Sequence, residues 1–503
     1  MEMFQLLGHG FQIALQPENL LLAFLGTLLG TVIGMLPGVG PINTIAILIP
    51  ITFSLQLPAT SALIMFAGIY YGSQYGNSIS SILLNVPGTA SAVVTAIDGH
   101  PMAKKGRAGP ALAMSAIASF VGSTLSILGL MLFAPLLAKW AISFGPAEYF
   151  VLMVFALSTL SSLTGGNVAK ALVATMLGLV LATVGLDPQG TTVRFTFGQL
   201  KLYDGMDLVV VVIGFFAISE VLQALSESGH GQHLETKVGR VMITIKEFTG
   251  SLMTMLRGSI LGFLVGVLPG AGATMGSFIA YTTEKKIVDP NDETFGKGDI
   301  RGVASPESAN NAAAVGAFIP LLTLGVPGSG TTAVMLAALL SFGIRPGPLL
   351  LQTNPDIFWG LVASMYIGNM MLLVLNLPLV GLFARILLVP RYVLMPLVAI
   401  LSFIGVYSVN NSAFDLLLMS GFGILGFAMR KAKFPLAPVI LGLVLGDLME
   451  VNLRRALSYS DGNWLALFQS PISIGLWIVT AISLIAPIII SKYRKSNIPL
   501  EGE

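Results

Sequence analysis

The chain has 503 residues, of which 54% are hydrophobic and 10% are charged; 26 Lys and Arg face 24 Asp and Glu, and there is no cysteine. So few charges exclude an ordinary soluble fold of this length, and the near-balanced charge gives no basic surface for a nucleic acid. The missing cysteine excludes disulfides and thiolate chemistry.

Long stretches without Asp, Glu, Lys or Arg indicate helices that cross a bilayer, because a helix needs about 20 apolar residues to do so. Residues 19–97 contain no charged side chain, and neither do 258–283 and 308–344. In chain order the apolar segments are 19–54, 60–97, 108–138, 147–164, 171–186, 207–225, 251–283, 305–344, 356–384, 392–409, 413–429, 434–449 and 466–491. They predict an all-α polytopic membrane protein with about 11 to 13 membrane segments.

A sequence pattern occurs twice. Gly34–Gly40 (GMLPGVG) returns as Gly266–Gly272 (GVLPGAG) at an offset of 232 residues, and Leu84–Thr89 (LNVPGT) returns as Leu324–Ser329 (LGVPGS) at an offset of 240. Matches in the same order with nearly equal offsets indicate a duplication. The predicted division is 1–225 as a first transmembrane repeat, 226–250 as a polar linker and 251–503 as a second transmembrane repeat, within one membrane domain.

Basic residues predict the orientation, since cytoplasmic loops carry an excess of Lys and Arg. The clusters expected on the cytoplasmic side are Lys104, Lys105 and Arg107; Lys237, Arg240, Lys246 and Arg257; Arg430, Lys431 and Lys433; and Lys492, Arg494 and Lys495. Their order along the chain is consistent if 60–97 and 305–344 are re-entrant hairpins, each entering and leaving by one face. The helix over 251–283 then runs outward and the repeats are inverted. This places Lys285, Lys286, Lys297 and Arg301 outside, against the rule, along with Arg454 and Arg455.

The Pro-Gly pairs predict helices that are broken inside the membrane, and many transporters bind substrate at such breaks. Each break is followed by hydroxyl or amide residues where a new helix would begin, and a helix N-terminus attracts anions. A structural kink is the alternative interpretation, and the Gly-xxx-Gly runs before each break are typical of close helix packing. The predicted substrate-binding residues are Asn43, Thr44, Asn77, Ser78, Asn85, Pro87, Gly88, Thr89, Thr274, Asn310, Asn311, Pro327, Gly328, Ser329 and Thr331.

Broken helices also free carbonyl oxygens, which can coordinate a coupling cation. The residues predicted for this role are Leu36, Pro37, Gly38, Leu268, Pro269, Gly270 and Glu307. Glu307 has a second interpretation as a helix-start residue. His230 and His233 are expected in a polar surface loop. No catalytic motif is found, so we expect neither an enzyme nor a cofactor or metal beyond a coupling Na⁺ or H⁺.

Several motifs carry a family resemblance: Gly34–Gly40, Tyr75–Thr89, Asp98–Met102 (DGHPM), Pro306–Asn311 (PESANN) and Gly325–Thr332. With them the chain resembles the large membrane subunit of the tripartite tricarboxylate transporters, the TctA family. The resemblance implies a multi-pass permease of the bacterial inner membrane, driven by an ion gradient. It also implies two partners, a periplasmic substrate-binding protein and a small four-helix membrane subunit, and carboxylate substrates such as citrate.

Two other functions remain open from the residues alone. One is a cation-coupled carboxylate carrier that works without a binding protein. The other is a membrane-embedded enzyme that acts on lipid substrates, which would need acid-base or metal-binding residues at mid-membrane.

Overall fold

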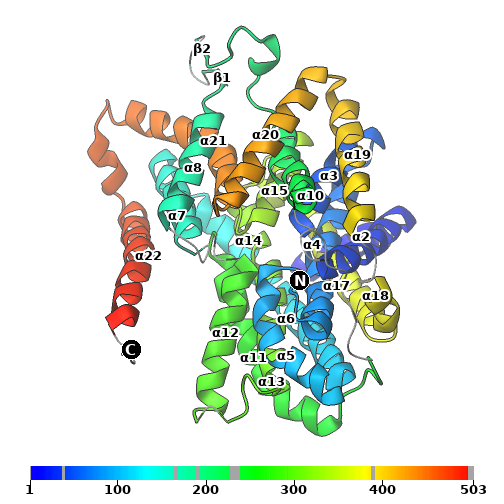
Figure 1. Cartoon of the computed structure of the whole chain (residues 1–503). Coiled ribbons are helices and arrows are strands. Elements are labelled where there is room, and N and C mark those ends of the chain that lie inside the picture. Colours follow the sequence, from blue (N-terminus) through cyan, green and yellow to red (C-terminus); the bar gives the residue numbers. More distant parts are fainter. Residues whose placement is uncertain are drawn as a thin grey trace, which may run out of the picture. The chain divides into compact units, whose positions relative to one another are not determined.

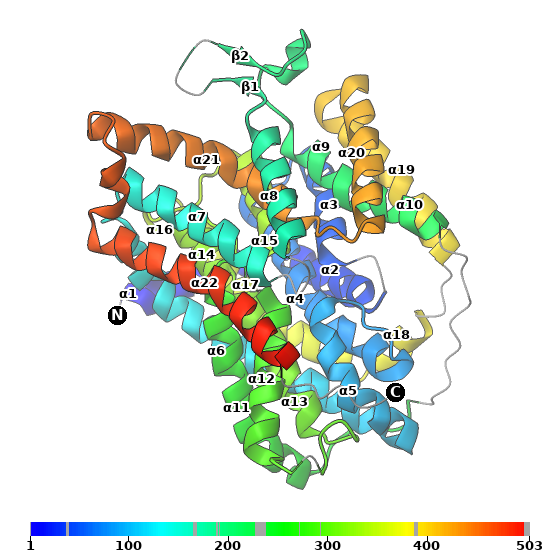
Figure 2. The same ribbon diagram turned by 60° about the vertical axis from the view of Figure 1, so that its left-hand side comes forward.

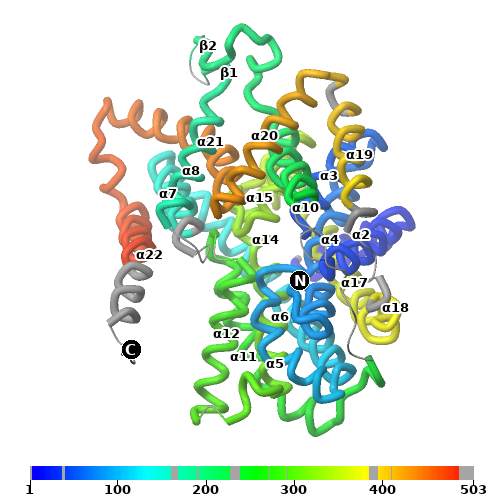
Figure 3. Tube along the Cα trace, viewed as in Figure 1, coloured from blue at the N-terminus to red at the C-terminus, as the bar shows by residue number. Residues whose placement is uncertain are grey.

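The computed structural model describes residues 2–36, 40–163, 168–187, 190, 192–226, 238–270, 272–291, 293–386 and 391–496 (Figures 1 and 3). These residues are helical nearly throughout, which confirms the predicted all-α polytopic fold. Six helical stretches are long and apolar enough to cross a membrane: Pro17–Met35, Ala90–Ala141, Leu208–Ser226, Ile245–Val267, Pro355–Asn376 and Ala413–Lys431.

The chain packs as two units, which are described separately. The first, residues 1–141 and 207–431, contains every predicted site residue. Its elements are α1 (Glu2–Ala14), α2 (Pro17–Met35), α3 (Pro41–Ser54), α4 (Ala59–Leu84), η1 (Ala90–Ala92), α5 (Val93–Met102), η2 (Ala103–Arg107), α6 (Ala108–Ala141), α9 (Leu208–Val212), η4 (Ile213–Ile218), α10 (Ser219–Ser226), α11 (Ile245–Val267), α12 (Gly272–Val288), α13 (Arg301–Gly316), α14 (Phe318–Leu324), α15 (Gly330–Ser341), α16 (Leu350–Thr353), α17 (Pro355–Asn376), α18 (Val380–Ile386), α19 (Arg391–Asn410) and α20 (Ala413–Lys431).

The second unit comprises residues 142–206 and 432–503. Its elements are α7 (Pro146–Leu163), α8 (Val168–Ala182), β1 (Gly185–Leu186), β2 (Val193–Arg194), η3 (Leu200–Leu202), α21 (Ala437–Tyr459), η5 (Trp464–Phe468) and α22 (Pro471–Ser496). The antiparallel pair β1–β2 is tied to α21, because Arg194 forms an ion pair with Glu450 and Arg454 forms one with Asp187. The two units are defined by which residues pack together. They do not test the predicted repeat boundaries, which stay a prediction.

Glycine contacts set the direction of the broken helices. A Cβ on Gly30 would lie 2.6 Å from the carbonyl oxygen of Ile69, and one on Gly34 would lie 2.3 Å from that of Ser73. Contacts that advance together along both helices mean that α2 and α4 are parallel. In the same way a Cβ on Gly266 would lie 2.3 Å from the carbonyl oxygen of Ala313, so α11 and α13 are parallel as well.

The segment 251–283 is a helical hairpin, and the prediction of one outward-running helix is wrong. Arg257 near the start of α11 pairs with Glu284 near the end of α12, and the two helices lie side by side in both views (Figures 1 and 2). The chain reverses at Leu-Pro-Gly because Gly270 adopts a positive φ of 84°, a conformation that glycine reaches without strain.

The prediction that the segments 60–97 and 305–344 are hairpins is wrong too. After the break Gly88 lies beside Asn77, and the chain then advances along α4 until the His100 ring is hydrogen-bonded to the carbonyl of Ile82. The chain therefore steps back at the break and continues in its original direction. α15 behaves alike: it begins near Ala317, before α14, and after its end the carbonyl of Pro346 lies beside Gly325, where α14 ends.

One end of the first unit collects the basic residues. Lys105 Nζ donates to the carbonyl of Lys297, and Arg107 pairs with Glu247. We call this the Lys105 end. The predicted outside placement of Lys285, Lys286, Lys297 and Arg301 is therefore wrong: since α12 runs back to this end, all four belong with Lys104 and Lys105. These four exceptions to the positive-inside rule disappear, whereas the outside placement of Arg454 and Arg455, in α21 of the second unit, stays a prediction.

The two sets of broken helices run in opposite directions. α6 is antiparallel to α4, because Ser115 bonds Ser78, whereas Tyr75, earlier on α4, bonds Asn369, which in turn bonds the carbonyl of Phe120 further along α6. The same α6 is parallel to α13, because Ser119 bonds Glu307 and Ser126 bonds the carbonyl of Ala312. Hence α4 and α13 are antiparallel, which agrees with the predicted inverted topology.

This arrangement predicts the sidedness of single cysteines in a chain that has none of its own. Lys105→Cys and Lys297→Cys should both react with a membrane-impermeant thiol reagent from the cytoplasmic side. Asp356→Cys, at the start of α17, should react from the opposite side, because α17 runs parallel to α4, with Gly360 beside Thr60 and Gly368 beside Tyr71. Labelling of the Lys105→Cys and Lys297→Cys variants from different sides would contradict the hairpin.

Candidate functional site

The two Pro-Gly breaks that follow α4 and α14 have the same backbone geometry. α4 ends at Asn85 with φ 55°, and α14 ends at Gly325 with φ 68°. The next N–H turns back in each case, from Val86 to the carbonyl of Ser80 and from Val326 to that of Pro320. All three pairs of positions differ by 240, so the sequence match extends to the local fold.

The helix starts that follow the breaks gather around α4. A Cβ on Gly272, at the start of α12, would lie 3.8 Å from that of Ser329, at the start of α15. Tyr70 on α4 is hydrogen-bonded to Ser329 at 3.1 Å, and Asn77 on α4 donates to Thr89 at 2.7 Å. The predicted residues after three of the breaks therefore lie close together in the first unit.

The start of η1 and α5 lacks a side-chain cap. Thr89 precedes η1 and makes no capping hydrogen bond with its side chain. Asn77 Nδ2 donates to Thr89, to Ser91 and to Gln74, and Ser91 donates to Gln74 at 2.8 Å. Asn77 Oδ1 is buried and has no hydrogen-bond partner in the described part of the chain. The sequence analysis did not predict Gln74 and Tyr70 as site residues, although each is a polar side chain in a segment without charges.

The start of α15 is closed by its own cap. Ser329 and Thr332 form a reciprocal capping box, in which each side chain accepts the other's backbone N–H at 3.2 and 2.8 Å. Those two donors are already used, so the prediction that a substrate takes them needs the cap to open. Pro327 and Gly328 are buried, and the Gly328 carbonyl accepts the N–H of Gly270 at 3.1 Å. The two breaks of the second repeat thus lie against each other.

Other predicted residues serve local structure. Ser78 accepts from Ser115, Thr44 donates back to the carbonyl of Gly40, and Asn85 is exposed as the helix-ending residue. Gly88 packs so closely that a Cβ would overlap the carbonyl oxygen of Gly34. The remaining positions are Asn43, buried in α3, Pro87 and Thr274, both partly buried, and Thr331, buried in α15.

Glu307 is fully buried within α13. Thr95 on α5 donates to one carboxylate oxygen at 2.5 Å, and Ser119 on α6 donates to the other at 3.2 Å. Since α13 begins at Arg301, the helix-start interpretation of Glu307 is wrong. Within the described residues no Lys, Arg or His side chain forms an ion pair with this carboxylate.

Two amides lie beside this carboxylate. Asn311 Nδ2 donates to Ser119, to the Glu307 carbonyl and to Asn310 Oδ1. In the part of the chain that the structure describes, Asn311 Oδ1 and Asn310 Nδ2 are buried without a partner. A buried polar atom without a partner is costly, so these two atoms indicate a place where a ligand or an ion completes the bonding.

The backbone oxygens predicted for the coupling ion divide into two groups. Leu36, Pro269 and Gly270 are buried, whereas Leu268 is 46% exposed. Pro37 and Gly38 lie outside the described residues, as do His230 and His233. No group of three His, Asp or Glu side chains that could hold a metal ion occurs among the described residues.

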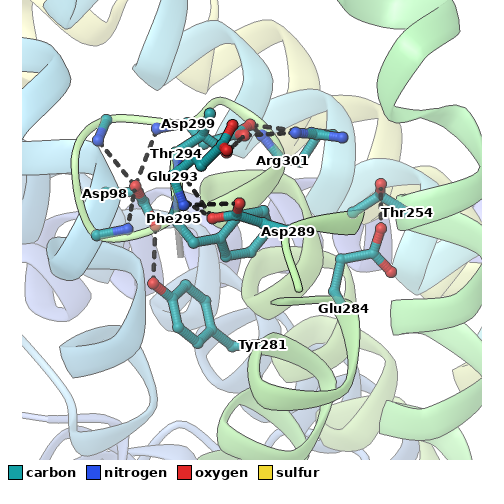
Figure 4. A network of polar contacts seen from close by, with 12 residues as sticks. Asp98, Thr254, Tyr281, Glu284, Asp289, Glu293, Thr294, Phe295, Asp299 and Arg301 are labelled. Carbon is teal, nitrogen blue, oxygen red and sulfur yellow. Dashed lines mark hydrogen bonds and ion pairs between the residues drawn. The ribbon is translucent and has the colours of Figure 1, made fainter. Parts of the chain in front are cut away.

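A second buried acid, Asp98, was not predicted as a site residue. Its Oδ1 accepts the backbone N–H groups of Gly296, Gly298 and Asp299 at 2.8 to 2.9 Å, and its Oδ2 accepts the hydroxyl of Tyr281 at 2.8 Å (Figure 4). Asp98 therefore fastens α5 to the loop between α12 and α13, nearly 200 residues further along the chain.

The same loop is anchored by Asp289. The N–H of Phe295, together with those of Thr294 and Glu293, lowers the pKa of Asp289 to about 2 (Figure 4). A carboxylate with a lowered pKa contributes stability above its unfolded pKa of about 4 and loses it as the pH falls toward 2. The fold of this loop is therefore insensitive to Asp289 titration at neutral pH.

Interrupted membrane helices that enclose buried, uncharged polar groups and one carboxylate define a polytopic membrane protein of the transporter type. The chain belongs to the family described as "Tripartite tricarboxylate transporter TctA family", whose model matches residues 20–441. It is thus a multi-pass membrane component of a transporter family that works with other subunits.

Two relatives come from Agrobacterium vitis, and both are uncharacterized. One, a "52.8 kDa protein in TAR-I ttuC' 3'region", is 45% identical over 476 residues, which cover 95% of this chain and 94% of the relative. The other, a "protein in TAR-II ttuC' 3'region", is 45% identical over 234 residues, 46% of this chain and 96% of the relative. No solved structure matches the chain.

Proposed function

We propose that this protein imports tricarboxylates or related carboxylates, citrate-like in charge, by coupling their entry to a cation gradient. The observation that carries the proposal is Glu307: a buried carboxylate with only neutral partners, close to unpaired amide atoms. A buried charge without a counter-charge is costly, so a cation or a proton must accompany Glu307 whenever it is closed off from water.

The substrate is expected at the gathered helix starts along α4. The groups that can donate there are hydroxyls and backbone N–H groups, foremost at Thr89, where the helix start lacks a side-chain cap. Neutral donors hold an anion less tightly than a buried Arg or Lys would, which favours release after transport. Asn77 orients Thr89 and Ser91 for this task.

The coupling cation has a direct energetic role. Moving a trianion into a cell at −100 mV requires about 7 kcal/mol, since each charge contributes roughly 2.3 kcal/mol. Cations that enter together with the substrate offset this requirement. Glu307, with the oxygens of Thr95, Ser119 and Asn311, supports this role, and the carbonyls around Leu36, Pro269 and Gly270 stay candidates for it. Both Na⁺ and H⁺ suit oxygen ligands of this kind.

The family supports the rest of the proposal. We infer a location in the bacterial inner membrane, a periplasmic binding protein that delivers the carboxylate, and a small four-helix membrane subunit. A carrier that works without a binding protein is the second candidate. A lipid-modifying enzyme has little support, because the family is a transporter family.

Uptake of radiolabelled citrate into proteoliposomes tests the function. With the small subunit present and the binding protein outside, uptake should require an inward Na⁺ or H⁺ gradient. Uptake of equal rate without any binding protein would instead establish the autonomous carrier. Absence of cation-dependent carboxylate uptake in every arrangement, across citrate, other di- and tricarboxylates and aromatic acids, would contradict the proposal.

Thr89→Val keeps the side-chain shape and removes the hydroxyl. We expect the apparent KM for the carboxylate to rise about tenfold or more, since a hydrogen bond to a charged group contributes about 1.5 to 3 kcal/mol. Thr323→Val is the matched control, because Thr323 is buried and bonds only within its own helix, to the carbonyl of Ile319. Equal KM values in the two variants would remove Thr89 from the substrate site.

Glu307→Gln replaces the carboxylate by a neutral amide of the same size. Net uptake driven by the cation gradient should fall at least tenfold, while exchange of internal for external carboxylate persists, because exchange needs no net cation movement. Glu284→Gln is the control: Glu284 is equally enclosed but pairs with Arg257. A Glu307→Gln protein with an unchanged cation dependence would refute the coupling role.

A further inference from the structure

The short helix α5 carries two buried polar contacts one turn apart. Thr95 donates to Glu307 on α13, and Asp98 accepts from the loop between α12 and α13. Both side chains are fully buried. Because a helix of this length moves as a rigid piece, displacement of one contact displaces the other.

The Asp98 contact is dense. Four donors converge on this one carboxylate, three from backbone N–H groups and one from Tyr281 (Figure 4). The start of α13 packs directly on it, since a Cβ on Gly302 would lie 2.1 Å from Asp98 Oδ2. A carboxylate that leaves these donors must find water, and because Asp98 is fully buried its release requires α5 to move away from α13.

α5 also covers the approach to Glu307 from that end. Val303 lies one turn before Glu307 on α13 and is fully buried. A Cβ on Gly99 would lie 3.6 Å from Val303 Cγ2 and 2.7 Å from Ile82 Cγ1. α5 is therefore packed between α4 and α13 in such a way that the side chain of Val303 meets no solvent while Asp98 is bound.

We propose that Asp98 is a latch that closes the Lys105 end of the pathway, and that Thr95 transmits the state of Glu307 to this latch through α5. The inference rests on the proposed coupling role of Glu307. A cation or proton on Glu307 competes with the Thr95 hydroxyl for the same carboxylate oxygen, and the altered Thr95 contact changes the hold of α5 on the loop. Opening of the latch then exposes Glu307 to the cytoplasm and releases the coupling ion.

The reaction rate of a buried thiol reports whether the Asp98 latch is open. Val303→Cys would introduce the single cysteine of the chain, and its reaction with a thiol reagent applied from the Lys105 side should be slow. Adding Asp98→Asn should raise the rate at least tenfold, and adding Tyr281→Phe should raise it less, because only one of four donors is lost. Asp207→Asn is the control, since the Asp207 carboxylate caps α9 by accepting the N–H groups of Val209 and Val210.

The link to Glu307 is tested in the same Val303→Cys background. Glu307→Gln should change the labelling rate of the introduced thiol severalfold, and Thr95→Val should cancel most of that change in the double variant. Unchanged labelling with both Asp98→Asn and Tyr281→Phe in folded, inserted protein would overturn the latch. A Glu307→Gln effect that persists in full beside Thr95→Val would overturn the transmission. Labelling needs no substrate, so a failure of carboxylate uptake would count against the proposed function alone.

Discussion

The interior of the first unit depends on contact between helix backbones. α2 meets α4, and α11 meets α13, at glycines whose Cβ would fall 2.2 to 2.6 Å from a carbonyl oxygen, as at Gly30, Gly34 and Gly262. No side chain fits at these distances, so the packing requires glycine. Because a bilayer offers no water to a broken helix, this close packing supplies the protein surroundings in which Leu-Pro-Gly can interrupt the chain.

The packing also determines what the polar groups can do. It places the helix starts after the breaks beside α4, where Tyr70 and Asn77 bond to Ser329 and Thr89. It encloses Glu307 with hydroxyls and amides and with no basic side chain among the described residues. Under the proposed function, the anionic substrate meets only neutral donors, whereas the coupling cation or proton meets the buried carboxylate of Glu307.

Local signals predicted part of this correctly. Charge-free segments indicated the all-α membrane fold. Pro-Gly pairs indicated the breaks that end α4 and α14, because a left-handed residue two positions before a proline is a short-range feature. The direction of the chain after each break could not be predicted. A Pro-Gly pair permits reversal or continuation of the chain, and contacts such as Arg257–Glu284 and Gly88–Asn77 decide between them. The reversal of the chain lies within 251–283 and not within 60–97 or 305–344, so Lys105 and Lys297 lie at the same end.

Local sequence signals also predicted only part of the candidate site. Thr89, Ser329 and Glu307 stood out because they are polar residues next to breaks or within charge-free sequence. Asp98 was not predicted as a site residue, since its partners lie 183 to 201 residues away and are mostly backbone N–H groups. Every residue except proline has such a group, so the sequence cannot indicate which of them bind Asp98. The caps of helix starts are equally hidden: Thr89 and Ser329 are equivalent in sequence, yet only Ser329 caps its helix.

The central claim is that the Pro-Gly breaks build the transport site and are more than kinks in membrane helices. Uptake by Gly328→Ala tests it most directly, because a Cβ there would lie 3.0 Å from that of Ala317 and 3.2 Å from the Gly266 carbonyl oxygen, which shifts the start of α15 without touching Glu307 or Asp98. The account predicts that protein inserted at normal levels, with the thermal stability of a Gly8→Ala control, loses carboxylate uptake. Normal uptake by that protein would contradict it.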